Sequence, residues 1–227
     1  QPCSNATWAN AWCQQVQRWI HDYLKDTNGA VMSYFYTPTT AYYARNLGKP
    51  ADTPYVRDAV LARIQYGQRD SSVYSTSPAA QVTFTYNGRC NTSATGCATS
   101  TLTSSSASHW PDVPFDLNCA SGATCSSNSP TFWTENELAG IQTQALVGTT
   151  ETNVDSWAFT YSFPATGDAT TPSLWLSSVT RAGQDTSGGG STSALTMPSV
   201  TFSGTPLSNR VDLTDGYPPI TRYRLNT

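Results

Sequence analysis

The sequence predicts an all-β protein built from antiparallel strand hairpins, and three observations support this. Charged residues make up 12% of the 227 residues, about half the share found in ordinary soluble domains. Lys occurs twice and Glu three times, although both residues commonly fill exposed helix faces. Several segments alternate apolar and polar residues with the period of two that is typical of strands. We therefore expect one domain over residues 1–227, with the hairpins forming an extended or curled, wall-like sheet.

The first expected element is a hairpin over residues 18–36 that turns at Asn28-Gly29. Both turn residues tolerate positive φ, which makes this dipeptide a strong hairpin signal. With a two-residue turn, Tyr23 would face Tyr34, whereas a bulge in the turn would shift the register by one residue. In either register both faces carry large apolar side chains. The hairpin therefore needs cover on both sides.

The next two strands are expected over residues 55–66 and 81–86. The first segment could be a short helix by propensity, but the spacing of Leu61, Ile64 and Tyr66 favours a strand. The second segment alternates cleanly and is the clearest strand of the chain.

Further strands follow in the second half of the chain. The residues from 154 to 163 alternate aromatic with small side chains, and residues 173–180 are expected to pair with them. A natural domain seldom ends inside a strand, so a strand close to the C-terminus makes the chain look like a piece of a longer protein. Segments 98–108 and 183–193 are rich in Ser, Thr and Gly, and we expect flexible loops there. The remaining strands are expected at 131–145, 197–203 and 220–225.

Six cysteines lie in three close pairs along the sequence. Six cysteines allow 15 pairings, but each close pair brackets a short polar stretch that could close as a loop. Local disulfides are therefore expected, with buried free thiols as the alternative. Disulfides and a low charge content fit an oxidising, extracellular setting. The expected pairs are Cys3 with Cys13, Cys90 with Cys97, and Cys119 with Cys125.

Charge and motif content argue against several classes of function. The net charge is −3 and basic residues form no block, so nucleic-acid binding is not expected. No apolar run approaches the roughly 18 residues of a membrane span. Two His and no Cys-x-x-Cys argue against a zinc site, and Gly188–Gly190 lacks the Lys-Ser/Thr of a phosphate loop. We expect no metal and no cofactor.

Ordered motifs along the chain resemble bacterial Rhs/YD-repeat proteins. Asp26-Thr-Asn-Gly29, followed by Tyr34-x-Tyr36 and Leu61-x-x-Ile64-x-Tyr66, is similar to their strand–turn–strand unit. The family's core repeat, Tyr-Asp followed by Gly, does not occur here, which leaves open a spacer or plug domain attached to the shell. Segments similar to the region ahead of the repeats in long Rhs-type proteins of Gram-positive bacteria are 109–116, 129–133, 154–157, 174–180 and 218–225.

The resemblance covers nearly the whole chain and implies a structural role. In that family the repeats wind into a large β-shell that encloses a C-terminal toxin and is delivered or displayed outside the cell. The implied partners are therefore the rest of a longer polypeptide, including an enclosed toxin domain. The implied location is secreted or at the cell surface.

One loop carries a candidate ligand site. His109, Asp112 and Asp116 lie in a Pro-stiffened loop together with Trp110. Two carboxylates and an aromatic ring could bind a cation or stack on a sugar ring. The structural alternative is that the carboxylates cap loop amides while the aromatic side chains fill the core. Calcium usually takes six or more oxygen ligands, which favours the structural alternative.

Catalytic signals are weak. Glu135 and Glu137 would share a face of one strand, and paired carboxylates could serve a glycosidase, but such pairs more often repel a neighbouring sheet edge. No Gly-x-Ser-x-Gly elbow is present, and His21 is expected to pack against a Tyr across the hairpin. We expect a non-catalytic shell or scaffold segment. The alternative is a carbohydrate-binding module or adhesin, suggested by 11% aromatic residues in a chain of low charge.

Overall fold

In a computed structural model of the protein, the strands of the described residues form one antiparallel sheet of nine strands. The structure describes residues 3–7, 10–45, 50–91, 97–125, 127–166, 170–186 and 193–205. The strands follow one another in sequence order from β1 to β8, and β9 pairs beside β8 on β7. The described residues contain no α-helix. The expected all-β class with disulfide-bonded loops is confirmed.

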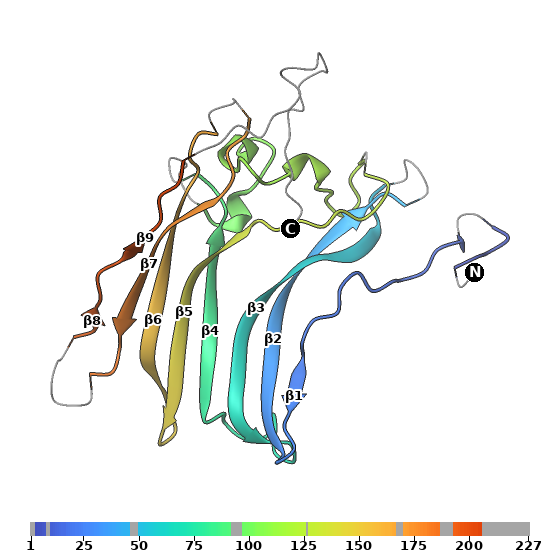
Figure 1. The fold of residues 1–227 in the computed structure, drawn as a ribbon. Helices are drawn as coiled ribbons and strands as arrows, with labels where there is room; N and C mark the ends of the chain where they lie inside the picture. The colour runs from blue at the N-terminus through green and yellow to red at the C-terminus, as the bar shows by residue number, and fades with distance from the viewer. Residues whose placement is uncertain are drawn as a thin grey trace.

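The strands stand side by side as a curved wall (Figure 1). None of the described segments is a helix of the length and apolarity that crossing a membrane requires. The bounds are β1 Tyr23–Lys25, β2 Ala30–Tyr43, β3 Thr53–Arg69, β4 Ala80–Gly88, β5 Asn136–Val147, β6 Thr150–Ser162, β7 Trp175–Gly183, β8 Leu195–Thr196 and β9 Val200–Thr201.

The first hairpin forms with a register one residue away from that of a two-residue turn. Tyr23 lies opposite Ser33 rather than Tyr34, because the turn carries a bulge with Gly29 at φ 77°. The Asp26 carboxylate accepts two backbone N–H groups across this turn, one of them from Ala30 at 2.8 Å. The two-residue register is therefore wrong, and the bulged alternative holds.

The later strands agree with the sequence pattern to within a few residues. The segment that could have been a helix lies in β3, and β6 pairs with β7 as expected. The strand expected from 131 starts at Asn136 and runs to Val147. The expected loop 98–108 holds the 3-10 turn η2 (Thr99–Thr101) and the start of η3 (Ala107–His109). Residues 220–225 and part of 183–193 lie outside the described residues.

The central sheet has one apolar face and one polar face. The cross-strand register and the alternation of side chains assign each residue to a face. The polar face carries Ser33, Gln65, Gln81, Thr83, Thr85, Gln142, Gln144, Asn153, Ser156, Thr160, Ser178 and Thr180. The apolar face carries Met32, Tyr34, Tyr36, Leu61, Ile64, Tyr66, Val82, Phe84, Tyr86, Leu138, Ile141, Trp157, Phe159, Tyr161, Leu176 and Val179. The same face also holds Thr143 and the ion pair of Asp155 with Arg181.

Among the described residues, no second layer covers either face of β5, β6 or β7. No residue of β5, β6 or β7 is buried. The apolar side chains of this face from β2 to β7 named above are half-buried, because their neighbours in the sheet shield them only in part. The sheet therefore presents a broad apolar surface without a packing partner among the described residues.

A compact core lies at one end of the wall, in the long connection between β4 and β5. We call the described residues 89–91, 97–125 and 127–135 the end cap (Figure 1). Its core consists of Cys90, Trp110 and Val113 with partly buried neighbours. Gly88, the last residue of β4, lies so close to the Trp110 ring and the Cys97 carbonyl that a Cβ at this position would overlap both.

Three disulfides cross-link the chain, and each joins two cysteines that are at most 10 residues apart in the sequence. Two of them, Cys90–Cys97 and Cys119–Cys125, lie in the end cap. The third, Cys3–Cys13, lies in the N-terminal segment ahead of β1. The expected pairing is therefore confirmed.

Candidate functional site

Two members of the candidate ligand loop are parts of the end-cap framework. Trp110 is 2% exposed in the core, so its ring is not available to stack on a sugar. The Asp112 carboxylate accepts hydrogen bonds from Arg89 Nε at 2.9 and 3.0 Å and from the backbone N–H of Leu174 at 2.9 Å. Asp112 thus joins the end cap to the segment that leads into β7.

The other two members lie on the surface of the end cap. His109 ends η3, and its backbone carbonyl accepts the N–H of Asn91 at 2.7 Å. Asp116 lies in the short 3-10 turn η4 (Phe115–Leu117) and is exposed. Among the described residues, no group of three or more His, Cys, Asp or Glu side chains could hold a metal ion.

A buried arginine that the sequence analysis did not single out connects the sheet to the end cap. Arg57 occupies a bulge of β3 and is 6% exposed. Its guanidinium forms an ion pair with Glu135 and donates to Asn118 Oδ1 at 3.1 Å. The same group lies over the Trp133 ring, 3.5 Å from its centre. Desolvation by burial lowers the pKa of Arg57, but it keeps its charge because an arginine pKa starts so high.

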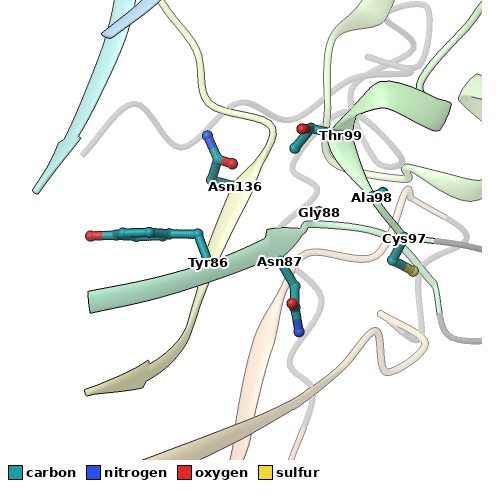
Figure 2. Close-up of a pocket in the computed structure, with 7 residues that line it drawn as sticks. All are labelled: Tyr86, Asn87, Gly88, Cys97, Ala98, Thr99 and Asn136. Carbon is teal, nitrogen blue, oxygen red and sulfur yellow. The ribbon is translucent and has the colours of Figure 1, made fainter. Parts of the chain in front are cut away.

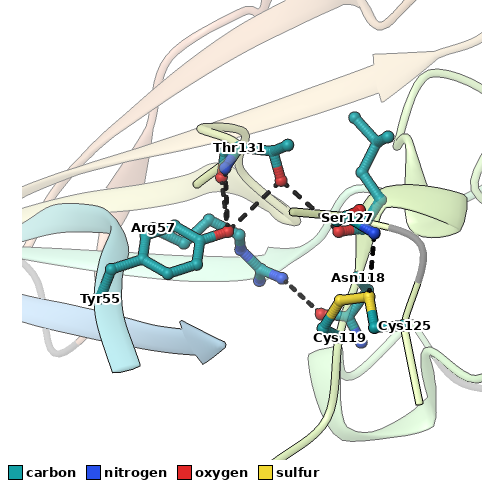
Figure 3. Close-up of a disulfide and its surroundings, with 8 residues drawn as sticks. Tyr55, Arg57, Asn118, Cys119, Cys125, Ser127 and Thr131 are labelled. Atoms are coloured by element: carbon teal, nitrogen blue, oxygen red, sulfur yellow. Dashed lines mark hydrogen bonds between the residues drawn. A yellow bond between two sulfur atoms is a disulfide. The ribbon is translucent and has the colours of Figure 1, made fainter. Parts of the chain in front are cut away.

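Near Arg57 lie a disulfide and a tyrosine whose hydroxyl is hydrogen-bonded to the backbone of the end cap (Figure 3). Arg57 reaches Asn118, which precedes the Cys119–Cys125 disulfide in the chain. Beside it the Tyr55 hydroxyl donates to the Thr131 carbonyl at 2.8 Å and accepts the Thr131 N–H at 3.1 Å. These contacts fix the end cap on β3.

Glu135 and Glu137 have different surroundings. Glu135 precedes β5 and pairs with Arg57. Glu137 lies within β5, opposite Asn87 of β4. Desolvation raises the pKa of Glu137, the nearby Arg89 counteracts part of this rise, and Asp112 adds to it. The Glu135 carboxylate is thus held in an ion pair, whereas the Glu137 carboxylate is half-buried.

Two shallow hollows lie near the end cap, and neither gathers catalytic groups. The second, of about 380 Å³, borders Glu137 and the aromatic residues at the end of β6. In the first, of about 470 Å³, the side chains point in different directions rather than toward one point (Figure 2). None of its lining residues is charged: they are Tyr86, Asn87, Gly88, Cys97, Ala98, Thr99 and Asn136.

A row of side-chain amides crosses four strands on the polar face. Gln65 of β3 donates to Gln81 of β4 at 3.2 Å, and Gln81 donates to Gln144 of β5 at 2.8 Å. Gln144 in turn donates to Asn153 of β6 at 2.9 Å. We call these four residues the amide ladder. In the sequence, the ladder is indicated only by Gln residues at polar positions of neighbouring strands. The strand register is needed to show that these residues lie side by side.

Comparisons with known proteins found a likeness to solved structures only. No family model matches the chain, and no curated protein matches it. Two solved structures are similar in part, the crystal structures of TcdB2-TccC3 and of TcdB2-TccC3-TEV, each 13% identical in sequence. The TM-scores are 0.43 and 0.42, over 80% and 82% of this chain. This chain spans 9% of the length of each of those two chains.

Proposed function

We propose that this chain is a structural, non-catalytic wall segment of a larger extracellular protein of the Rhs/YD-repeat type. The observation that carries the proposal is the apolar face of the sheet, whose apolar side chains from β2 to β7 are half-buried and have no covering layer in the described part of the chain. A sheet with one apolar face normally packs that face against a second layer. The missing layer is assigned to the rest of the same polypeptide, including a domain enclosed by the wall.

The edge formed by β8 and β9 supports the same proposal. Leu195 is 75% exposed and Val200 is 59% exposed, and both share the apolar face of β7 by register. Fully burying one such side chain stabilises a protein by about 1.5–3 kcal/mol. Exposed apolar patches of this kind mark contact surfaces. A partner on this face would therefore stabilise the fold.

The charged side chains support a structural role because they link elements of the fold. The ion pair of Arg57 with Glu135 joins β3 to the start of β5, and the ion pair of Arg89 with Asp112 links two parts of the end cap. Arg181 of β7 pairs with Asp155 of β6 at 2.9 Å. Three local disulfides fit secretion or display at the cell surface.

Dye binding tests whether the apolar face is open. The isolated chain should bind an apolar fluorescent dye, and replacing Phe159 with Ser together with Val179 with Thr should reduce the signal strongly. The matched control replaces Thr160 and Thr180, on the opposite face of the same strands, with Ser. A parent chain that binds no dye, or equal losses in the two double variants, would contradict an open apolar face.

Hydrogen exchange tests the role as a wall segment. The isolated chain is compared with the full polypeptide of the same reading frame. The backbone amides of β1 and β9, at the two sides of the sheet, should exchange more slowly in the longer protein, where further layers cover them. Equal exchange in both proteins would overturn the proposal.

Turnover assays test the non-catalytic part. We expect no hydrolysis of glycosides, esters or peptides by the purified chain. Hydrolysis that disappears in a folded Glu137→Gln variant would identify an enzyme instead.

A further inference from the structure

We propose that the hollow between the separating ends of β5 and β6 binds an alkylammonium group, the chemistry of a lysine side chain, with Glu137 as its counter-ion. This hollow has a volume of about 380 Å³ and is the one that Glu137 borders. The inference goes beyond the role as a wall segment and does not depend on it.

The hollow exists because two neighbouring strands separate toward the end cap (Figure 1). The pairing of β5 with β6 ends where Gly140 lies opposite Ala158. Beyond this point β5 extends back to Asn136 in pairing with β4, and β6 extends to Ser162 in pairing with β7. Both ends are therefore held by their outer neighbours, and the opening between them is not a frayed edge.

Two bulges and one hydrogen bond shape the opening. Ala139 of β5 has no partner in β4, and Ser177 of β7 has no partner in β6. A bulge bends its strand and can end the pairing, and bulges are frequent beside functional sites. The Tyr161 hydroxyl of β6 donates to the Leu138 carbonyl of β5 at 2.8 Å. This bond spans the two separated strands and fixes the width of the hollow before any ligand arrives.

Glu137 contributes a negative charge that the fold does not neutralise. Among the described residues, its carboxylate has no ion-pair partner. Arg89 is the cation that acts on its pKa, but the Arg89 guanidinium is already paired with Asp112. The charges of Arg89 and Asp112 balance each other, so the charge of Glu137 remains. A half-buried carboxylate without a partner is costly, and a bound cation would remove that cost.

The polar lining of the hollow fits an ammonium group better than a metal ion. Calcium takes six or more oxygen ligands, whereas the hollow offers one carboxylate. An ammonium group has three N–H donors and no acceptor. Glu137 can accept one of these donors, and the hydroxyls of Thr160 and Ser162, which also line the hollow, are further acceptors.

The aromatic lining fits the rest of the ligand. Phe159, Tyr161 and Phe163 all border the hollow. Aromatic ring faces attract cations, and they pack against the aliphatic stem of a lysine-like side chain. Ligand pockets usually have about 300–1,000 Å³, so a hollow at the lower end of this range suits one short alkyl chain.

The charged and titratable groups around Glu137 set the pH dependence of binding. They are Arg89 and Asp112 of the end cap and Tyr161 of β6, and the β4 residue opposite Glu137 is the neutral Asn87. A bound ammonium group favours the ionised carboxylate, so it should lower the raised pKa of Glu137. Affinity should therefore be highest at neutral pH and fall as the pH is lowered through the pKa of the free protein.

NMR titration of the full chain tests the site. The ligands are N-acetyl-lysine N-methylamide and n-butylamine, in about 0.15 M salt so that exposed charges are screened. Both should shift the carboxyl signal of Glu137 and the backbone amide signals of Phe159 and Tyr161, and both should lower the pKa of Glu137. Tighter binding of the lysine derivative would identify a protein partner as the source of the amine, and equal binding would identify a free amine. If neither ligand binds, the proposal is overturned.

A matched ligand and matched variants locate the binding. N-acetyl-norleucine N-methylamide has the same alkyl chain without the charge and should not bind. Glu137→Gln should lower the affinity for the amines at least tenfold without lowering the melting temperature at pH 7. Phe163→Leu, which removes one ring, should lower it about two- to fivefold.

The control variant is Glu151→Gln, at the other end of β6 and outside the hollow. It should bind both amines as the parent does. Binding of the norleucine derivative as tight as that of the lysine derivative, an unchanged affinity in Glu137→Gln, or an equal loss in Glu151→Gln would each overturn the assignment.

Discussion

Arg57 of β3 lies against Trp133 of the end cap, with its guanidinium 3.5 Å from the centre of the indole ring. The same guanidinium pairs with Glu135, so one side chain holds the last residues of the end cap on the sheet. The pair is buried, with 5% and 15% of the two side chains exposed. Because β5 begins directly after this contact, Arg57 also fixes where the second half of the sheet starts.

Replacing Arg57 with Met should lower the free energy of unfolding by about 3 kcal/mol, because Glu135 would be left buried without its partner. Urea unfolding measures this loss. The double variant with Glu135→Gln should lose less than the single variant. Lys25→Met, in an exposed pair with Asp70 at 2.6 Å, is the matched control and should cost less than about 1 kcal/mol. Equal losses at the two sites would show that the Arg57 pair does not anchor the end cap.

Gly88→Ala should destabilise the protein by about 1–3 kcal/mol, since the added Cβ would overlap the Trp110 ring and the Cys97 carbonyl. Gly183→Ala is the control, because a Cβ there has no neighbour closer than 4.0 Å. Thermal unfolding of both variants checks the difference. A Gly88→Ala protein as stable as the parent would contradict the close packing of β4 against the end cap.

The fold class was predictable because it depends on patterns local in the sequence. Alternation identified the strands that became β4 and β6, and the spacing of Leu61, Ile64 and Tyr66 favoured the strand that became β3. The segment that became β7 was expected as the partner of β6, and the close spacing of the cysteines indicated the disulfide pairs. The turn at Gly29 was visible, but its register was not, because a bulge and a two-residue turn use the same residues. The Asp26 carboxylate, which caps the turn, decides between them.

The candidate site was less predictable because it depends on contacts between distant segments. The sequence around Trp110 and Asp112 is the same whether these residues bind a ligand or stabilise the fold. Only their neighbours Cys90 and Arg89 show that both are structural. Arg57 gave no signal, since an isolated Arg in a strand is usually exposed. The amide ladder required the register of four strands, which no single segment contains.

Removing the Cys119–Cys125 disulfide by changing both residues to Ala should cost about 2 kcal/mol, the value expected for a short closed loop. Its loop is tied to the sheet, since Ala51 exchanges two backbone hydrogen bonds with it, at 2.8 Å with Ala123 and 2.7 Å with Gly122. The same change at Cys3–Cys13 is the control. That disulfide lies in an exposed segment ahead of β1, so the unfolding of the sheet should be unaffected. A larger loss from the N-terminal pair would show that the contacts of this segment, such as the Trp12 ring 3.9 Å from the Arg45 guanidinium, support the sheet.

Glu137→Gln should make the protein more stable at pH 7, in contrast to Glu135→Gln, which breaks an ion pair. Desolvation raises the pKa of Glu137 above its ordinary value of 4.5, so near that pKa the folded state holds more protons than the unfolded state. Stability therefore falls as pH rises from 4.5 through the raised pKa. The Gln variant lacks this loss, so its advantage should be present at pH 7 and disappear at about pH 4, where both states of the parent become protonated. Melting temperatures of the parent and the two variants at pH 4 and pH 7 measure the effect. An advantage that is the same at both pH values would show that the change acts through packing and not through the buried charge.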